Sequence, residues 1–523
     1  MSSPLRSPHP DVVVPDRSLI DHLLGDLGED ADRTALVDGA RSLTFRELRA
    51  LVDSAATGLA ARVGPGEVAA LVAPNSIGFV VAFLGALRAG VTVTPVNVLA
   101  TADEVARQVT DSGAQVVLAS GAYSSTALEA VELAGPGPGA AVVLEDALAD
   151  WSSLPAYVGE PVTAPATHLA VLPYSSGTTG RPKGVMLTHR NLVANLAQIE
   201  ELLAVGRESV LLGVLPFSHI YGMTVVLHLA LRRRATLVVV PRFDLEAVLG
   251  LVEQHRMTHL FVAPPVVLAL AKSPEVDAHD LSSVAVVLSG AAPLDEALAS
   301  AVADRLDCQV RQAYGMSEMS PVSHLAPVSA HLPASSVGWT VPNMSIRLVD
   351  VATGADIEPP TEGVSTPGEL CCSGPNVMAG YLGNEAETRD SIDELGYLHT
   401  GDIATVSADG VVRIVDRLKE LIKYKGYQVA PAELEGLLLG HPDIADAAVV
   451  GIAQGTTGDE WPKAFVVPSA GASLDAEQVI TYVADRVAPY KKVRIVEFVD
   501  AIPKSASGKI LRRELRTPAP ATI

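Results

Sequence analysis

Short apolar runs rich in Val, Leu and Ala recur along the chain up to about Gly338, and patterns typical of helices separate them. This alternation restricts the fold strongly, because buried parallel strands read as apolar runs and need a crossover helix between them. It predicts an α/β protein with doubly wound, mostly parallel sheets. We expect strands at about 68–72, 115–119, 141–144, 168–173, 210–215, 236–240, 259–263, 285–288 and 310–314, with helices in the gaps.

One predicted helix shows how clear the local signals are. Thr44 and Glu47 have the spacing of a capping box, and Gly64 is expected to end the helix. The residues expected on its buried face are Phe45, Leu48, Val52, Ala55 and Leu59.

The pattern changes twice in the second half of the chain. After Gly338, shorter strands punctuated by Gly and Pro, such as 345–349 and 369–372, predict a small barrel. Near Asp416 the chain becomes basic and then returns to a βαβ-like pattern. We therefore expect a large domain at 1–415, a hinge at 416–419 and a small mobile α+β domain at 420–523.

The segment 174–184, YSSGTTGRPKG, follows one of the predicted strands and concentrates hydroxyls, glycines and one lysine. Glycines let successive N–H groups converge on an anion, hydroxyls add donors or magnesium ligands, and lysine adds a positive charge. A flexible surface turn is the competing interpretation, and the length and order of the pattern favour a phosphate site. It is not a Walker loop, because no Gly-Lys-Ser or Gly-Lys-Thr occurs. We expect ATP to bind here, through Ser175, Ser176, Gly177, Thr178, Thr179, Gly180 and Lys183.

Composition excludes several classes of protein. At 523 residues with 48% hydrophobic residues, the chain is long enough for at least two domains, and no apolar stretch is long enough to cross a bilayer. A net charge of −22 disfavours nucleic acid as a partner. Three cysteines cannot form a disulfide framework, so we expect buried thiols. The sequence predicts no membrane insertion and a cytoplasmic location.

Other residues that could carry chemistry are scattered, and each has an ordinary structural interpretation. His219 follows a predicted strand at the sheet edge where ligands bind in open α/β folds, although a lone histidine there is more often structural. Glu318 is a candidate magnesium ligand beside Tyr314, which is able to stack on a base. Asp402 could accept from ribose hydroxyls or stabilise a turn. The basic segment 419–427 and Lys509 could be solvated surface.

Taken together and in order, these motifs resemble those of the adenylate-forming superfamily of acyl-CoA synthetases, luciferases and peptide-synthetase adenylation domains. The resemblance covers about residues 30–513, and the segment 419–435, KELIKYKGYQVAPAELE, is most similar to coumarate-CoA ligases and beetle luciferases. It implies an AMP-forming acid–thiol ligase, with ATP, Mg²⁺ and CoA as cofactors. Such an enzyme joins a carboxylic acid to AMP, releases pyrophosphate and then transfers the acyl group to CoA.

The resemblance also implies roles for individual residues. Lys509 would bridge the carboxylate and the α-phosphate, and His219 would orient the carboxylate and gate the thiol channel. After rotation about Lys419, a second face of the small domain would serve CoA. The remaining implied sites are magnesium at Glu318 and Thr178; phosphate at Ser317; adenine and ribose at Gly290, Ala291, Ala292, Gln312, Ala313, Tyr314, Asp402 and Arg417; and CoA at Lys423, Tyr424, Lys425 and Gly426.

The implied acyl pocket is almost wholly apolar. Amino-acid-activating relatives carry an aspartate in the strand end corresponding to 217–221, and none lies there, so an α-amino acid is disfavoured. Ala313 and Ser317 stand where coumarate-CoA ligases commonly carry glycine and threonine. A planar aryl or cinnamic acid is the first expectation, and a medium-chain or bulky alicyclic acid the second. The pocket residues are Tyr221, Val225, Leu288, Ala313, Gly315, Met316, Pro321 and Val322, with Gly290 and Ala291.

Two alternatives to the CoA ligase remain at this point. The acceptor could be the pantetheine thiol of a carrier protein, or the chain could be a non-catalytic nucleotide-binding paralogue. The KYKG segment favours free CoA, and intact Lys183, Glu318, Asp402 and Lys509 argue against the paralogue.

Overall fold

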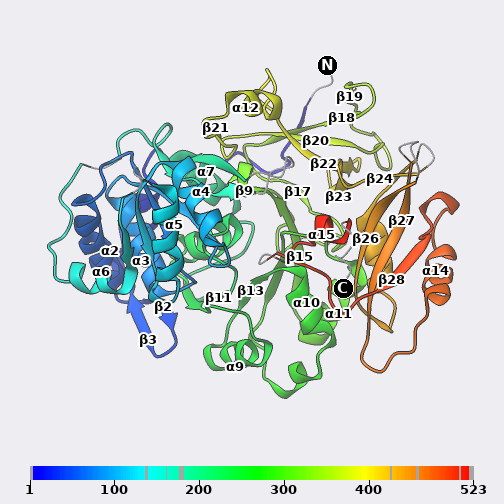
Figure 1. The fold of residues 1–523 in the computed structure, drawn as a ribbon, viewed down its shortest axis with the longest axis horizontal. Helices are drawn as coiled ribbons and strands as arrows, with labels where there is room; N and C mark the ends of the chain where they lie inside the picture. Colours follow the sequence, from blue (N-terminus) through cyan, green and yellow to red (C-terminus); the bar gives the residue numbers. More distant parts are fainter. Residues whose placement is uncertain are drawn as a thin grey trace.

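The computed structural model describes residues 4–135, 139–160, 162–175, 182–424, 427–454, 459–505 and 508–516. Its larger part contains two sheets of mostly parallel strands and one antiparallel sheet. A smaller C-terminal lobe, running from β24 (Ile422–Tyr424) to α15 (Arg512–Arg516), lies against this part, as Figure 1 shows. The predicted α/β class is confirmed.

The first sheet has the strand order β21-β10-β8-β5-β4-β6-β7, with β9 paired to β10. Its central strands are parallel, and β10 runs antiparallel to β8. The strands are β4 (Val68–Val72), β5 (Thr92–Pro95), β6 (Ala114–Ala119), β7 (Ala141–Val143), β8 (Leu169–Val171), β9 (Tyr174–Ser175), β10 (Lys183–Thr188) and β21 (Gly380–Tyr381). The helices of this region are α2 (Phe45–Ala60), α3 (Ile77–Arg88), α4 (Ala102–Ser112), α5 (Ser124–Ala134), α6 (Leu144–Trp151) and α7 (His189–Ile199).

The second sheet has the order β17-β16-β15-β14-β13-β11-β12-β2-β3 and is parallel from β15 to β2. Its strands are β2 (Thr34–Asp38), β3 (Arg41–Thr44), β11 (Val210–Gly213), β12 (Thr236–Val239), β13 (His259–Val262), β14 (Val286–Ser289), β15 (Gln309–Gly315), β16 (Val322–Leu325) and β17 (Trp339–Thr340). Its helices are the π-helix η3 (Tyr221–His228), α8 (Leu229–Arg232), α9 (Leu245–His255), α10 (Pro264–Lys272) and α11 (Glu296–Leu306).

The antiparallel sheet follows, in the order β1-β18-β20-β22-β23, with β19 paired to β18. Its elements are β1 (Leu5–Arg6), β18 (Ser345–Val349), β19 (Asp356–Ile357), β20 (Gly368–Ser373), β22 (Leu398–Val406) and β23 (Val412–Arg417), beside helix α12 (Glu385–Ser391). The C-terminal lobe adds β25 (Tyr427–Val429), α13 (Pro431–Leu439), β26 (Ile444–Gln454), β27 (Asp459–Pro468), α14 (Ala476–Ala484) and β28 (Ile495–Phe498).

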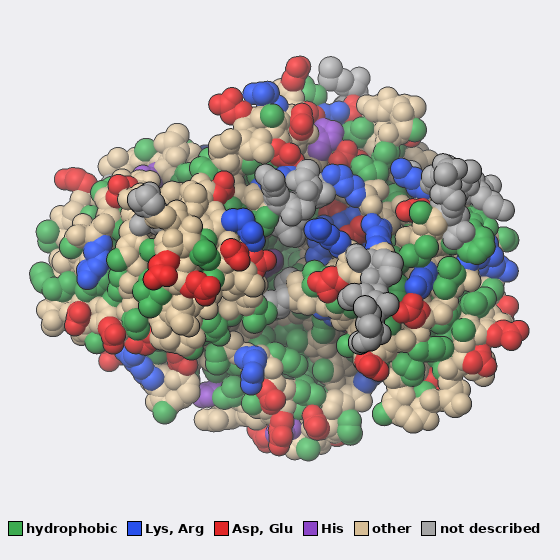
Figure 2. All heavy atoms as spheres, viewed as in Figure 1, with side chains coloured by type: hydrophobic (Ala, Val, Ile, Leu, Met, Phe, Trp, Pro, Cys, Tyr) green, Lys and Arg blue, Asp and Glu red, His purple; other side chains and the backbone are tan. Residues whose placement is uncertain are grey.

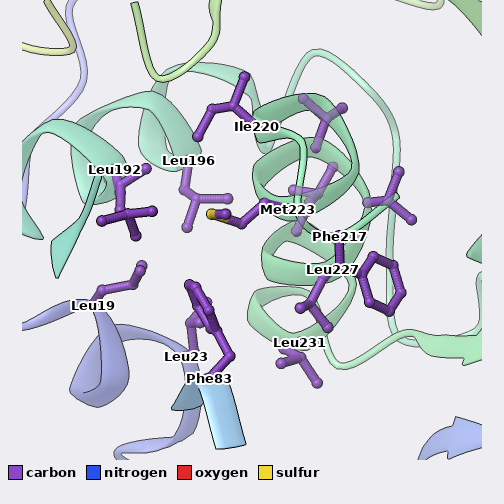
Figure 3. Packing of buried hydrophobic residues seen from close by; sticks show 14 of the residues in the cluster. Leu19, Leu23, Phe83, Leu192, Leu196, Phe217, Ile220, Met223, Leu227 and Leu231 are labelled. Atoms are coloured by element: carbon purple, nitrogen blue, oxygen red, sulfur yellow. The ribbon is translucent and has the colours of Figure 1, made fainter. Parts of the chain in front are cut away.

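One hydrophobic core joins the two large sheets, and the C-terminal lobe has its own. In the large core, α1 (Leu19–Leu24) packs against α3, α7 and α8, and η3 packs against α7 and α8; Figure 3 shows side chains from these elements. Burial of apolar surface stabilises the folded state by roughly 25 cal/mol per Å². The labelled side chains there are Leu19, Leu23, Phe83, Leu192, Leu196, Phe217, Ile220, Met223, Leu227 and Leu231.

The strand predictions hold to within a few residues, and the capping box of Thr44 and Glu47 is present. The predicted set was incomplete, because it lacked strands β2, β3, β5, β10 and β16, and two element boundaries differ. Leu144, predicted to end a strand, begins α6. Helix α2 ends at Ala60, before Gly64. Strand β5 lies where helices were expected, because its sequence Thr-Val-Thr-Pro lacks a long apolar run although all four residues are buried. The three cysteines are free and buried, as predicted.

Within the described part of the chain, no helix combines the length and the apolar character that crossing a bilayer requires.

Candidate active site

The two ends of the predicted phosphate loop lie side by side. Strands β9 and β10 are antiparallel, and Ser175 is paired with Lys183. The residues that flank the predicted loop on either side are therefore neighbours in the first sheet. The predicted residues Ser176, Gly177, Thr178, Thr179 and Gly180 lie outside the described residues.

Glu318 joins the start of this loop to two other segments. It lies in a short 3-10 turn (Ser317–Met319) and is buried, with 5% of its surface exposed. Its Oε1 atom accepts hydrogen bonds from the Ser175 hydroxyl and the Tyr381 hydroxyl, both at 3.0 Å. A buried carboxylate beside a hydroxyl is an oxygen donor set of the kind that Mg²⁺ prefers.

Lys183 is held by residues that the sequence reasoning missed. Its ammonium group forms an ion pair with Glu387 of α12 and lies 5.1 Å from the centre of the Tyr381 ring. The Lys183 side chain is only 10% exposed. In this structure the cation expected to bind phosphate thus has a carboxylate partner. No local signal marks Glu387, because it lies 204 residues away in the sequence.

The predicted ribose residues also converge. Asp402 is buried, and its Oδ2 accepts a 2.6 Å hydrogen bond from the Tyr314 hydroxyl. Arg417 lies opposite Asp402 across β22 and β23, with its Nε 3.5 Å from Oδ1. Burial raises the pKa of Asp402, while Arg417 and the Tyr314 hydrogen bond oppose the rise. Glu369, which the sequence analysis missed, accepts from the neighbouring Gly401 N–H at 3.1 Å.

The predicted adenine segment 290–292 follows β14. Ala291 has φ of 72°, a left-handed conformation that is costly for alanine and is often found at ligand sites. The side-chain oxygen of Gln312 accepts a hydrogen bond from the Leu294 N–H at 2.5 Å. Gln312 therefore ties the loop after β14 to strand β15. Ala313 and Tyr314 continue along β15 from Gln312 and are half-buried.

The predicted acyl-pocket residues lie around the second sheet. Tyr221 begins the π-helix η3, a rare conformation frequent at functional sites, and donates to the Leu288 carbonyl at 3.0 Å. A Cβ atom on Gly290 would lie 2.8 Å from the Tyr221 ring, so the two are in close contact. Val225, Leu288 and Val322 are buried, Met316 is half-buried, and Gly315 lies against Pro321.

Lys509 enters this region from the C-terminal lobe. The preceding Gly508 has φ of 81°, and a Cβ there would lie 3.1 Å from Pro265 of the large part. Burial, and then the nearby Arg417, lower the pKa of Lys509 to about 8, while Glu420 and Asp402 oppose this. On the face shown in Figure 2, basic side chains gather where the two lobes meet.

His219 lies within electrostatic range of Lys509. Its Nδ1 accepts from the Tyr221 N–H at 3.3 Å, which leaves Nε2 as the protonated nitrogen of the neutral ring. The ring is open to solvent, yet desolvation by the surrounding walls, followed by Lys509, lowers its pKa. A neutral imidazole that donates from Nε2 is suited to orient a carboxylate.

The predicted CoA segment lies elsewhere in the C-terminal lobe. The Lys423 N–H donates to Glu460 at 3.0 Å, and the Tyr424 hydroxyl accepts from Arg494 at 3.2 Å. Lys419, the predicted hinge, is an exposed residue in the turn between β23 and β24. The predicted residues 425 and 426 lie outside the described part of the chain.

Comparison with known proteins defines the class to which this arrangement belongs. Residues 27–382 match the AMP-binding enzyme family, and residues 433–509 match the AMP-binding enzyme C-terminal domain. The chain belongs to the AMP-binding enzyme family, which confirms the resemblance drawn from its motifs.

Several individual relatives are similar to this chain over nearly its whole length. The chain is 42% identical to 4-coumarate–CoA ligase 5 of Oryza sativa subsp. japonica, over 99% of this chain and 98% of the relative. It is 39% identical to 4-coumarate-CoA ligase 1 of Narcissus pseudonarcissus, with 98% and 95% covered. Among solved structures it is similar to ATP-bound MatB from Rhodopseudomonas palustris (TM-score 0.87, 27% identity, 96% and 98% covered). A benzoate CoA ligase from Burkholderia xenovorans LB400 gives TM-score 0.83 at 26% identity, with 96% and 100% covered.

Proposed function

We propose that this chain is an ATP-dependent acid–CoA ligase that forms an acyl-adenylate and then an acyl-CoA thioester. The observation that carries the proposal is the approach of the C-terminal lobe at Gly508 to Pro265 of the large part, which brings the charge of Lys509 within electrostatic range of Asp402, Arg417 and His219. Glu318 and Lys183 flank the predicted phosphate loop. A nucleotide bound across these groups would have its ribose at Asp402 and its phosphates between the two lysines.

In the first step, two anions must meet, the substrate carboxylate and the α-phosphate. Lys509 offsets their repulsion and the charge that develops on the phosphoryl oxygens. Lys183 holds the leaving pyrophosphate, and His219 donates from Nε2 to orient the carboxylate. The donors at Glu318 fit magnesium, which when bound supplies further positive charge to the phosphates.

In the second step, the thiol of CoA attacks the acyl carbonyl and AMP leaves. Lys509 would obstruct the thiol where it now lies, so the C-terminal lobe turns about Lys419 and withdraws it. The segment 423–426 then faces the site. Residues 1–415 and 420–523 act as the fixed and the moving domain.

The substrate is an apolar carboxylic acid, and an aryl or cinnamic acid is the first candidate. Val225 and Leu288 present hydrocarbon, and the Tyr221 hydroxyl is already bound to a backbone carbonyl. A buried ammonium group would have no partner among these residues, which disfavours amino acids. The names of the 4-coumarate–CoA ligase relatives agree with this class.

The test is a pyrophosphate-release screen over a panel of carboxylic acids, with and without CoA. An apolar aryl acid should give pyrophosphate with ATP and a thioester only when CoA is added. Adenylate without thioester, followed by acylation of a carrier protein, would favour the carrier-protein alternative. No acid-dependent pyrophosphate from any member would favour a non-catalytic paralogue. ATP and CoA as co-substrates are consistent with the predicted cytoplasmic location.

A further inference from the structure

Helix α13 begins without a side-chain cap of its own. Its N-cap residue is Ala430, which has no side-chain acceptor, and its first helical residue is Pro431, which has no N–H. The N–H of Ala432 is therefore the first backbone donor that needs a partner outside the helix. The cap that the sequence lacks locally comes from elsewhere in the fold.

Asp416 provides it. Its Oδ2 atom accepts from the Ala432 N–H at 2.9 Å, and its Oδ1 atom accepts from the Arg417 N–H at 2.7 Å. Asp416 is 6% exposed and lies in β23, where it is paired with Ile403 of the antiparallel sheet. A carboxylate is the favourable ligand for a helix N-terminus. This cap joins the large part of the molecule to the C-terminal lobe, because Asp416 precedes the Lys419 turn and α13 follows it.

Charged residues near Asp416 link the start of helix α13 to the segment that carries Lys509. Arg512 binds Glu420 at 2.7 Å and Glu435 of α13 at 2.6 Å, and it lies three residues beyond Lys509. Burial raises the pKa of Asp416 to about 6; its two N–H donors and Arg512 oppose this, and Glu420 adds to it. Helix α13 and helix α15, which begins at Arg512, are thus joined by an ion pair and both pack on β26, and Lys509 lies three residues before Arg512.

We propose that Asp416 is a positioning residue, a helix cap across the hinge that holds the C-terminal lobe in the orientation that places Lys509 in the site. The inference rests on the proposed function. A cap between the two parts favours the adenylate-forming arrangement and must open when the lobe turns. Its loss shifts the balance toward the thioester-forming arrangement.

The experiment compares both half-reactions in Asp416→Ala and wild type. Acid-dependent pyrophosphate exchange should fall about fivefold relative to thioester formation from supplied acyl-adenylate, the change expected for one lost N-cap. The matched control is Asp475→Ala. Asp475 caps α14 within the C-terminal lobe, through the Gln478 N–H at 2.8 Å. It should lower the melting temperature without changing the ratio of the half-reactions.

A second variant separates orientation from stability. Adding Ala430→Ser to Asp416→Ala gives α13 a cap inside its own lobe, so the melting temperature should recover while the altered ratio persists. If Asp416→Ala does not fold, Asp416→Asn, which keeps an acceptor but loses the charge, should shift the ratio less and in the same direction.

Two outcomes overturn the proposal in distinguishable ways. An unchanged ratio in the Asp416 variants, with both half-reactions active in wild type, shows that the cap is structural only. Absence of acid-dependent exchange in wild type refutes the proposed function, and the role of Asp416 falls with it.

Discussion

The ion pair between Lys183 and Glu387 makes a sharp prediction about ATP binding. If Lys183 turns to the phosphates of ATP, the pair exists only in the ATP-free protein and ATP must compete with Glu387. The Glu387→Ala substitution then destabilises the ATP-free state, because Lys183 loses its partner there, and leaves the stability of the ATP-bound state unchanged. The predicted result is tighter binding of ATP, opposite to the usual effect of removing a charged residue from a site.

The size of the effect follows from the burial of the pair. The two side chains are 10% and 26% exposed, between a surface pair worth up to about 1 kcal/mol and a buried charged hydrogen bond worth about 1.5–3 kcal/mol. We take about 1–2 kcal/mol, which corresponds to a roughly 5- to 30-fold lower Kd for ATP.

The assay is calorimetric titration of MgATP in the absence of acid. Glu385→Ala is the matched control, because Glu385 lies on the same helix with its side chain 92% exposed. It removes the same charge without touching Lys183. Weaker ATP binding by Glu387→Ala, or binding equal to that of the control, would refute the reasoning that phosphate captures Lys183.

Three further predictions concern the other parts of the site. Tyr314→Phe removes the 2.6 Å hydrogen bond to buried Asp402 and should raise the KM for ATP about tenfold; a change in the KM for the acid alone would contradict the ribose assignment. Lys509, whose pKa is lowered to about 8, is charged below that pH, so kcat/KM for pyrophosphate exchange should fall as pH rises through 8. A profile that rises there would exclude a protonated lysine. Gly290→Ala places a Cβ 2.8 Å from the Tyr221 ring and should raise the KM for the acid severalfold in steady-state assays, while an unchanged KM would remove this wall from the pocket.

The fold was largely predictable because its signal is local. Most of the parallel strands are apolar runs bounded by turns, so the residues that make them buried also mark their limits. Strand β5 was not predicted, because its Thr and Pro residues are not apolar by type and are buried by the neighbouring strands β4 and β8 and by helix α3. The π-helix at Tyr221–His228 has no sequence signature of this kind.

The site was predictable only as separate motifs. The sequence indicated Glu318 and Lys183, but their partner Tyr381 lies 63 residues from Glu318, and Glu387 lies 204 residues from Lys183. The cap of α13 by Asp416 likewise depends on how the two lobes meet. Such contacts are set by tertiary packing, and periodicity or spacing does not encode them.

The central claim is that two faces of the C-terminal lobe contribute residues to the same active site, one in each half-reaction. It is tested most directly by measuring both half-reactions in Lys509→Ala and Lys423→Ala. The account predicts that Lys509→Ala loses acid-dependent pyrophosphate exchange and keeps thioester formation from supplied acyl-adenylate, whereas Lys423→Ala does the reverse. Equal loss of both half-reactions in each variant would contradict it.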